Sequence, residues 1–229
     1  INAAAYTAVD LAETEVEKAF LVNADGTENL AEACAENNAQ FIHVSTDYVF
    51  DGENNLAYTE EDFTNPLGIY GASKLAGDEL ALEVNPCSVI LRTSWVYSEF
   101  GKNFVKTMLS LFATKEELNI VADQFGQPTN ANDLAEAIMK IIKSEKITPG
   151  IFNFSNLGRI SWFDFAEKIA ELSEAKIKLN AIETSQYPTP AKRPKNSVLD
   201  LDKISKTYGV QLKPWEESLE GCVQILQNN

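Results

Sequence analysis

Residues that bind metals or form disulfides are scarce in this sequence. Its 229 residues include one histidine and three widely spaced cysteines, Cys34, Cys87 and Cys222. Such an odd, scattered set excludes a disulfide framework and shows no metal-ligand spacing, so we expect buried free thiols and no metal site. His43 lies inside an apolar run with no acidic cluster beside it, which favours a core or edge histidine over a ligand or a base.

Long apolar runs are absent as well. No stretch approaches the ~20 apolar residues of a membrane-spanning helix, and no basic segment precedes an apolar one as in a signal peptide. We therefore expect a cytoplasmic protein with no membrane partner. Lysine and arginine total 19 against 34 acidic residues, a net charge of −15. Such a surface repels nucleic acid, so we expect no nucleic-acid partner. A small phosphorylated ligand remains compatible, because local cations or helix N-termini can bind it.

The first half of the chain alternates apolar runs of strand length with helical patterns. Residues 41–45 and 88–92 have the composition of strands, and apolar spacing predicts helices over about 15–36 and 70–82. Continuous apolar runs are typical of strands that are buried on both faces. The alternation therefore predicts an α/β fold with a Rossmann-like, doubly wound parallel sheet.

The second half contains weaker signals of the same two kinds. We expect helices over 103–112, 132–142 and 161–172, a strand over 151–154, an ordered loop over 184–197 and a terminal helix that begins at Pro214. The third of these helices begins with a capping box, formed by Ser161 and Asp164.

One pair of residues on the helix predicted over 70–82 indicates chemistry. Tyr70 and Lys74 are four residues apart, a spacing that places two side chains on one face of a helix. An ammonium group there favours the phenolate and should lower the tyrosine pKa from its usual value of about 10. A tyrosine tuned in this way can donate a proton to a carbonyl or accept one from an alcohol. Alone, the pair also fits an ordinary solvated helix face.

Thr46 gives this pair a structural context. It follows the strand over 41–44, at the edge where an open parallel sheet places its ligand crevice. Thr46 precedes Tyr70 by 24 residues, which leaves room for one loop to bring the two hydroxyls together. Two hydroxyls that converge on a carbonyl oxygen would stabilise the charge it gains when hydride arrives. The structural alternative is a loop-starting threonine and an aromatic residue at a helix start.

Five strings along almost the whole chain resemble one enzyme family. They are NAAAYTAVD (2–10), STDYVFD (45–51), YGASKLAG (70–77), RTSWVY (92–97) and YPTPAKRP (187–194). In order and spacing they resemble the dTDP-4-dehydrorhamnose reductases, a family of extended short-chain dehydrogenases/reductases. One string alone would be weak, whereas the five together are specific.

The resemblance implies roles for individual residues. Tyr70 would be the proton donor, Lys74 would hold the nicotinamide ribose and lower the Tyr70 pKa, and Thr46 would assist at the carbonyl. The cofactor, NADPH or NADH, would be bound by Ala5, Tyr6, Thr7, Tyr70 and Lys74. The sugar-nucleotide substrate would contact Val9, Asp10, Thr46, Asp47, Trp95 and Arg193. For two of these positions the alternative is an ordinary structural role: Trp95 would be a core aromatic, and Arg193 a solvated loop cation.

The resemblance also implies how the chain is organised. Residues 1–94 would be the C-terminal part of a dinucleotide-binding Rossmann domain, and residues 95–229 mainly a smaller C-terminal α/β substrate-binding domain with segments that return to the first. The chain begins at Ile1 without a methionine and has no Gly-x-Gly-x-x-Gly loop. In the family that loop lies near the N-terminus and holds the pyrophosphate. We therefore expect an N-terminally incomplete sheet, with the residue that selects NAD or NADP in the preceding segment.

The implied reaction is reduction of the 4-keto group of dTDP-4-dehydro-L-rhamnose, in nucleotide-sugar and cell-surface polysaccharide biosynthesis, by an enzyme that could form a homodimer. An epimerase or dehydratase of the same superfamily is one alternative. Dehydratases place Asp-Glu after the threonine, whereas Asp47 is followed by Tyr48 here, which favours reduction. A non-catalytic subunit like the regulatory subunit of methionine adenosyltransferase is the other alternative. The intact set of Thr46, Tyr70 and Lys74 argues against it.

Overall fold

A three-stranded parallel sheet lies at the centre of the protein. The structure, a computed structural model, describes residues 1–228. The strand order is β1 (Ile42–Thr46), β2 (Val89–Thr93) and β7 (Gly150–Asn153). All five residues of β2 are buried, as expected for an apolar strand covered on both faces. The predicted parallel α/β sheet is confirmed, and β7 shows that a segment beyond residue 94 returns to it.

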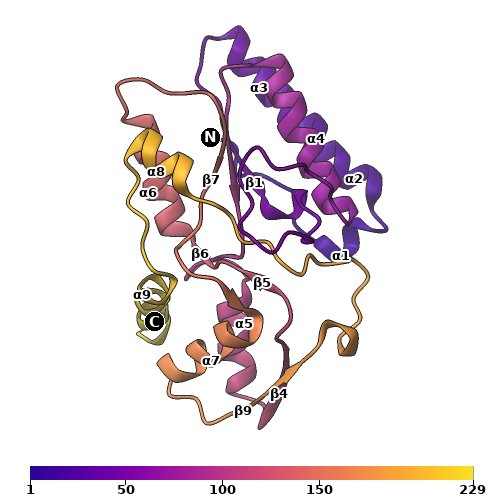
Figure 1. The fold of residues 1–229 in the computed structure, drawn as a ribbon, viewed down its shortest axis with the longest axis vertical. Coiled ribbons are helices and arrows are strands. Elements are labelled where there is room, and N and C mark those ends of the chain that lie inside the picture. The colour runs from indigo at the N-terminus through magenta and orange to yellow at the C-terminus, as the bar shows by residue number, and fades with distance from the viewer. Residues whose placement is uncertain (229) are drawn as a thin grey trace.

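Helices cover both faces of this sheet (Figure 1). On one face α3 (Gly26–Glu36) and α4 (Ile69–Val84) pack against each other and against the strands. On the other face lie α6 (Ala131–Ile142) and α8 (Asp202–Tyr208). The cores on the two sides share the strands: Ile90 is buried with α3 and α4, whereas its neighbours Val89 and Leu91 are buried with α6 and α8.

The helix predicted over residues 15–36 is present, but its middle is irregular. It runs from α2 (Val16–Phe20) through a π-helix, η1 (Leu21–Asp25), into α3. Single π turns inside α-helices are rare and frequently occur at functional sites. Here the turn contains the buried Asn23 and lies directly against α4. A Cβ atom on Gly77 would lie 2.1 Å from the Asn23 carbonyl oxygen, so only glycine allows this approach.

A second core surrounds Phe165, and the helices that form it lie in the lower part of Figure 1. Its helices are α5 (Phe104–Phe112), α7 (Trp162–Leu172) and α9 (Trp215–Gln227), and β4 (Glu117–Val121) pairs in parallel with β9 (Lys178–Ile182). Two further pairs consist of two-residue strands: β3 (Val96–Tyr97) pairs with β6 (Thr129–Asn130), and β5 (Phe125–Gly126) pairs with β8 (Ile160–Ser161). The remaining elements are α1 (Val9–Ala12), η2 (Asp47–Val49) and η3 (Thr184–Gln186). The capping box at Ser161 is confirmed, and a domain boundary at residue 94 stays a prediction.

Three further expectations can be compared with the structure. No helix within residues 1–228 combines the length and the apolar character that crossing a bilayer requires. In the same residues no three His, Cys, Asp or Glu side chains come together as a metal-binding group.

Cys222 is buried and Cys34 is partly buried, but the expectation of a buried thiol is wrong for Cys87, which is exposed. Cys87 lies in the connection between α4 and β2, and such connections run over the protein surface.

Candidate active site

The end of β1 and the start of α4 bring Thr46 and Tyr70 together. Thr46 is the last residue of β1, and Tyr70 is the second residue of α4. The Thr46 hydroxyl is close enough to the Tyr70 phenol to lower the pKa of that phenol. It also donates to Asp47 Oδ1 at 3.1 Å. The two hydroxyls therefore meet at the carboxyl edge of the sheet, as their spacing predicts.

The N-terminus of α4 is held in place from two sides. Gly68 at the cap position has no side chain to accept from the first free N–H groups, and Glu13 Oε1 accepts from the Ile69 N–H at 2.9 Å instead. On the other side, a Cβ on Gly71 would lie 2.2 Å from the Tyr48 carbonyl oxygen. These contacts fix the position of Tyr70 relative to the strand that bears Thr46.

Lys74 lies one turn beyond Tyr70, but its amine is directed into the sheet. Its Nζ donates to the Val44 carbonyl at 2.7 Å and lies 2.9 Å from Nε2 of His43. Only 1% of the Lys74 side chain is exposed. Burial lowers the pKa of Lys74 to about 8, although the nearby carboxylate of Asp78 opposes this shift.

The predicted lowering of the Tyr70 pKa is wrong for this structure. Burial raises the pKa of Tyr70 to about 12, with smaller increases from Asp47 and Asp78, while the Thr46 hydroxyl lowers it. The physical reason is that β1 engages the Lys74 amine, so desolvation of the phenol outweighs any charge effect along the helix. At neutral pH the phenol therefore retains its proton.

The segment expected to line the cofactor is fixed by η1. Asn23 Oδ1 accepts from the Tyr6 N–H at 2.7 Å, and Asn23 Nδ2 donates to the Tyr6 carbonyl at 3.1 Å. The same amide donates to Ser73 Oγ on α4 at 3.0 Å. Ala5 is partly exposed and Thr7 is exposed. Asn23 therefore fixes the backbone of this segment beside α4.

Asp47 is a buried acid next to the two hydroxyls. It is 2% exposed, and burial raises its pKa to about 6 against the opposing effects of the Ser197 and Thr46 hydroxyls. A carboxyl group of this kind changes its charge close to neutral pH, beside the edge of the sheet where a substrate would lie.

Two residues expected to contact substrate are bound to each other. Arg193 donates from Nη1 to Asp10 Oδ1 at 3.1 Å and from Nη2 to Asp10 Oδ2 at 2.9 Å. The pairing lowers the pKa of Asp10. Val9 and Tyr70 line one narrow crevice with Ala191, Lys192 and Pro194, the neighbours of Arg193 in its loop. The structure therefore brings the N-terminal segment, the start of α4 and this distant loop to one place.

A larger cavity of about 410 Å³ begins on the other side of this loop. Most of the side chains that line it are apolar or aromatic, and a few are polar. The lining includes Phe104, Met108, Gln124, Trp162, Tyr187 and Arg193. Such a composition is typical of small-molecule sites. Arg193 thus lines this cavity and also belongs to the loop beside Tyr70.

Trp95 does not line this cavity itself but packs against Trp162, which does. Its ring stacks on that of Trp162 with centroids 3.5 Å apart, and a Cβ on Gly126 would lie 2.6 Å from the ring. The backbone of Trp95 has φ of 48°, which is unusual for a bulky residue and costs on the order of 1–3 kcal/mol. Strain of this kind persists where the surroundings impose it, and here the Trp162 ring and Gly126 hold the indole in place.

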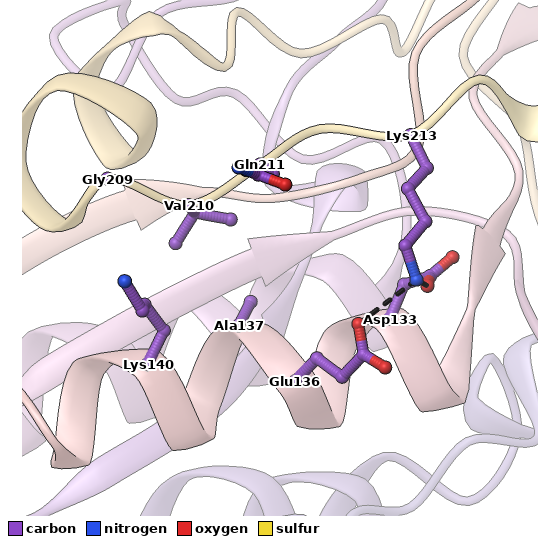
Figure 2. Close-up of a pocket in the computed structure, with 8 residues that line it drawn as sticks. All are labelled: Asp133, Glu136, Ala137, Lys140, Gly209, Val210, Gln211 and Lys213. Carbon is purple, nitrogen blue, oxygen red and sulfur yellow. Dashed lines mark hydrogen bonds and ion pairs between the residues drawn. The ribbon is translucent and has the colours of Figure 1, made fainter.

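A separate cavity of about 260 Å³ lies between α6 and residues 209–213, away from these groups (Figure 2). Lys213 reaches across it to Asp133 at 2.7 Å and Glu136 at 3.0 Å. These ion pairs fasten the C-terminal segment to α6. The lining contains no hydroxyl or phenol that could serve the chemistry described above.

Sequence reasoning did not identify the residues that support the site. His43 is buried as expected, but it contacts Lys74, and Asn23 and Glu13 hold the N-terminal segment and the start of α4. A polar residue inside a helical pattern is the signal that marks Asn23. Nothing in the local sequence around Glu13 indicates that it caps a helix 56 residues away.

Comparison with known proteins gives a consistent result over the whole chain. The family model described as RmlD substrate binding domain matches residues 1–228. A relative named dTDP-4-dehydrorhamnose reductase from Sinorhizobium fredii is 48% identical over 99% of this chain and 79% of its own length. The crystal structure of a dTDP-4-dehydrorhamnose reductase from Clostridium acetobutylicum has a TM-score of 0.95 at 42% identity, covering 99% of this chain and 80% of that one. One from Bacillus anthracis, in complex with NADP, has a TM-score of 0.93 at 40% identity, covering 97% and 79%.

Proposed function

The chain belongs to the dTDP-4-dehydrorhamnose reductase family, and we propose that it reduces the 4-keto group of dTDP-4-dehydro-L-rhamnose to give dTDP-L-rhamnose. The observation that carries this proposal is the meeting of the Thr46 and Tyr70 hydroxyls at the carboxyl edge of a parallel sheet. Open α/β sheets bind their ligands at this edge.

NADPH or NADH supplies the hydride for such a reduction. The residues present fit the nicotinamide end of this cofactor, because Tyr6 is pinned by Asn23 beside α4 and its neighbours are small. Ala5, Tyr6 and Thr7 would line the ring, and Tyr70 and Lys74 would hold the ribose. The Bacillus anthracis reductase was crystallised in complex with NADP, which supports NADP as the kind of cofactor.

The chain's own residues move one proton. Tyr70 is protonated at neutral pH, because burial raises its pKa to about 12. It can therefore donate this proton to the carbonyl oxygen as that oxygen gains charge, and the alkoxide formed is more basic than the phenol. The Thr46 hydroxyl supplies a second contact to the same oxygen, which positions it and stabilises the developing charge.

The cavity beyond the Arg193 loop suits the nucleotide part of the substrate. Its aromatic and apolar lining, which includes Trp162 stacked on Trp95, can hold a thymine ring. Arg193 can attract the pyrophosphate while Asp10 holds the guanidinium in place. Val9 and Asp47 lie on the side of Tyr70 and would contact the sugar.

The remaining sequence-based expectations belong to the same proposal. Residues 1–94 would form the C-terminal part of the cofactor-binding domain, and residues 95–229 mainly the substrate-binding domain. The net charge of −15 supports the absence of a nucleic-acid partner. Three free cysteines are typical of the reducing cytoplasm. The resemblance to the family is compatible with a homodimer.

The proposal is tested by replacing Tyr70→Phe in the complete enzyme and following NADPH oxidation with dTDP-4-dehydrorhamnose. Removing a general acid costs on the order of 10²–10⁴-fold in rate, so we expect turnover to fall by at least ~10²-fold. Tyr208→Phe is a matched control, because this phenol lies on α8 and bonds the Thr148 backbone; it should keep the wild-type rate. Turnover that survives in Tyr70→Phe would contradict the assignment.

A further inference from the structure

The cavity beyond the Arg193 loop contains a buried amide group. Gln124 directly precedes β5 and lines this cavity together with Phe104 and Trp162. Only 5% of Gln124 is exposed, and most of the side chains around the cavity are apolar or aromatic. A polar group in such surroundings is costly unless its donors and acceptors find partners, so the partners of this amide carry information about the ligand.

The orientation of the Gln124 amide is fixed by Thr184. Gln124 Nε2 lies 3.0 Å from Thr184 Oγ1. The Thr184 hydroxyl donates its own hydrogen to Asp123 Oδ1 at 2.6 Å, and a carboxylate oxygen can only accept. Thr184 Oγ1 is therefore the acceptor in its contact with Gln124, which must supply an N–H group. A flipped amide would place two acceptors opposite each other.

This orientation directs the amide oxygen of Gln124 to the cavity. Within residues 1–228 Oε1 accepts no hydrogen bond, yet it is not sealed from solvent. The residue as a whole is buried and lines the cavity, so the accessible oxygen faces the cavity. A free acceptor among apolar walls suits a ligand that brings a hydrogen-bond donor on a flat, apolar ring.

The nucleotide of the proposed substrate offers two such donors. In dTDP they are N3–H of thymine and the 3′-hydroxyl of deoxyribose, because the ionised phosphates only accept. The aromatic and apolar lining favours the base over the polar sugar. We propose that Gln124 is a specificity-determining residue, whose Oε1 accepts a hydrogen bond from N3–H of the thymine ring. The inference rests on the proposed function for the identity of the nucleotide.

The proposed contact selects one edge of the pyrimidine ring. Thymine and uracil both present N3–H between two carbonyl groups. Cytosine presents a lone pair at N3, so it would place two acceptors opposite each other at Oε1 and leave both unpaired. An unpaired buried acceptor of this kind is expected to weaken binding by about 10-fold or more.

The test is calorimetric titration of the complete enzyme with dTDP and with 5-methyl-dCDP, which has the same size but lacks N3–H. The wild type should bind dTDP more tightly by about 10-fold or more. In Gln124→Met, which keeps the length of the side chain but loses the acceptor, the two affinities should agree within about threefold. Because dUDP shares the N3–H edge but lacks the methyl group, it should lose affinity in this variant by the same factor as dTDP.

A matched control is Gln224→Met on α9, because this exposed amide bonds only Glu220 of the same helix. It should keep the wild-type preference for dTDP. A merely structural role of Gln124 would lower both affinities together and leave their ratio unchanged, which would overturn the inference. So would a wild type that binds the two nucleotides alike.

A third nucleotide separates the base from the sugar. Dideoxythymidine diphosphate lacks the 3′-hydroxyl, and its affinity relative to dTDP should be the same in the wild type and in Gln124→Met. If the variant instead abolished this difference, Oε1 would bind the sugar and the inference would be wrong. These titrations need neither cofactor nor turnover, so their outcome is separate from that of the Tyr70→Phe assay, which tests the proposed reaction.

Discussion

Replacing Asn23→Leu should loosen the cofactor-lining segment and destabilise the fold. The two side chains have nearly the same size, so the change removes hydrogen bonds without leaving a large cavity. Asn23 is fully buried and makes three of them, to the N–H and the carbonyl of Tyr6 and to Ser73 Oγ, at 2.7, 3.1 and 3.0 Å. Each contributes about 0.5–1.5 kcal/mol net. Because Tyr6 is partly exposed and water can replace some of this, we expect a loss of about 2–3 kcal/mol in the free energy of unfolding.

The measurement is urea unfolding followed by tryptophan fluorescence, together with the KM for NADPH. Freeing the Tyr6 backbone should raise this KM by about 10-fold, because part of the binding energy would be spent on ordering the segment. Asn132→Ala is the control, since this exposed amide bonds only Glu99, and its effect should stay within about 0.5 kcal/mol. A stability loss below about 1 kcal/mol with an unchanged KM would refute the reasoning.

Two further outcomes follow from the packing and the electrostatics. Gly77→Ala places a Cβ 2.1 Å from a carbonyl oxygen of η1 and should lower the free energy of unfolding in urea by about 1–3 kcal/mol. The control is Gly221→Ala in α9, whose Cβ meets no atom within 4 Å and should raise the free energy of unfolding by up to about 1 kcal/mol. Equal effects of the two substitutions would contradict the close packing at Gly77. Burial raises the folded-state pKa of Asp47 to about 6 from 3.8, so its contribution to stability is complete below the unfolded pKa and is lost as pH rises through about 6. Asp47→Asn should therefore gain stability relative to the wild type as pH rises between about 4 and 6 and keep that gain at higher pH, and a pH-independent difference in urea midpoints would count against a raised pKa.

The elements with strong local signals could be predicted from the sequence. The apolar run of β2 and the Ser161 capping box of α7 each determine their structure within a few residues. The two-residue strands could not be found, because two residues show no periodicity. The pairing of β4 with β9 joins segments about 60 residues apart, and neither half-exposed strand has a clean alternation of apolar and polar residues.

The sequence predicts that Thr46 and Tyr70 come together, but it does not predict the electrostatics of the candidate site. Thr46 and Tyr70 stand at a strand end and at a helix start, so topology alone brings them together. The direction of the Lys74 amine depends on acceptors in β1, and the Tyr70 pKa depends on burial. Helical spacing contains neither kind of information. His43 contacts Asn2 and Lys74 through its two ring nitrogens, and both partners lie more than 30 residues away, so no local pattern predicts these contacts.

The wide turn of η1 makes the register of the N-terminal helix part of the catalytic architecture. In an ordinary α-helix each residue advances about 100° around the axis. A π-helical turn holds one residue more than the α-helical turn that it replaces, so deleting one residue between Leu21 and Asp25 would let α2 continue into α3 as a regular helix. The flanking helices would stay nearly in place, but the residues of the turn would change position, and the Asn23 side chain that holds the Tyr6 backbone would no longer face it. A regular α-helix in place of η1 would therefore give a less active enzyme.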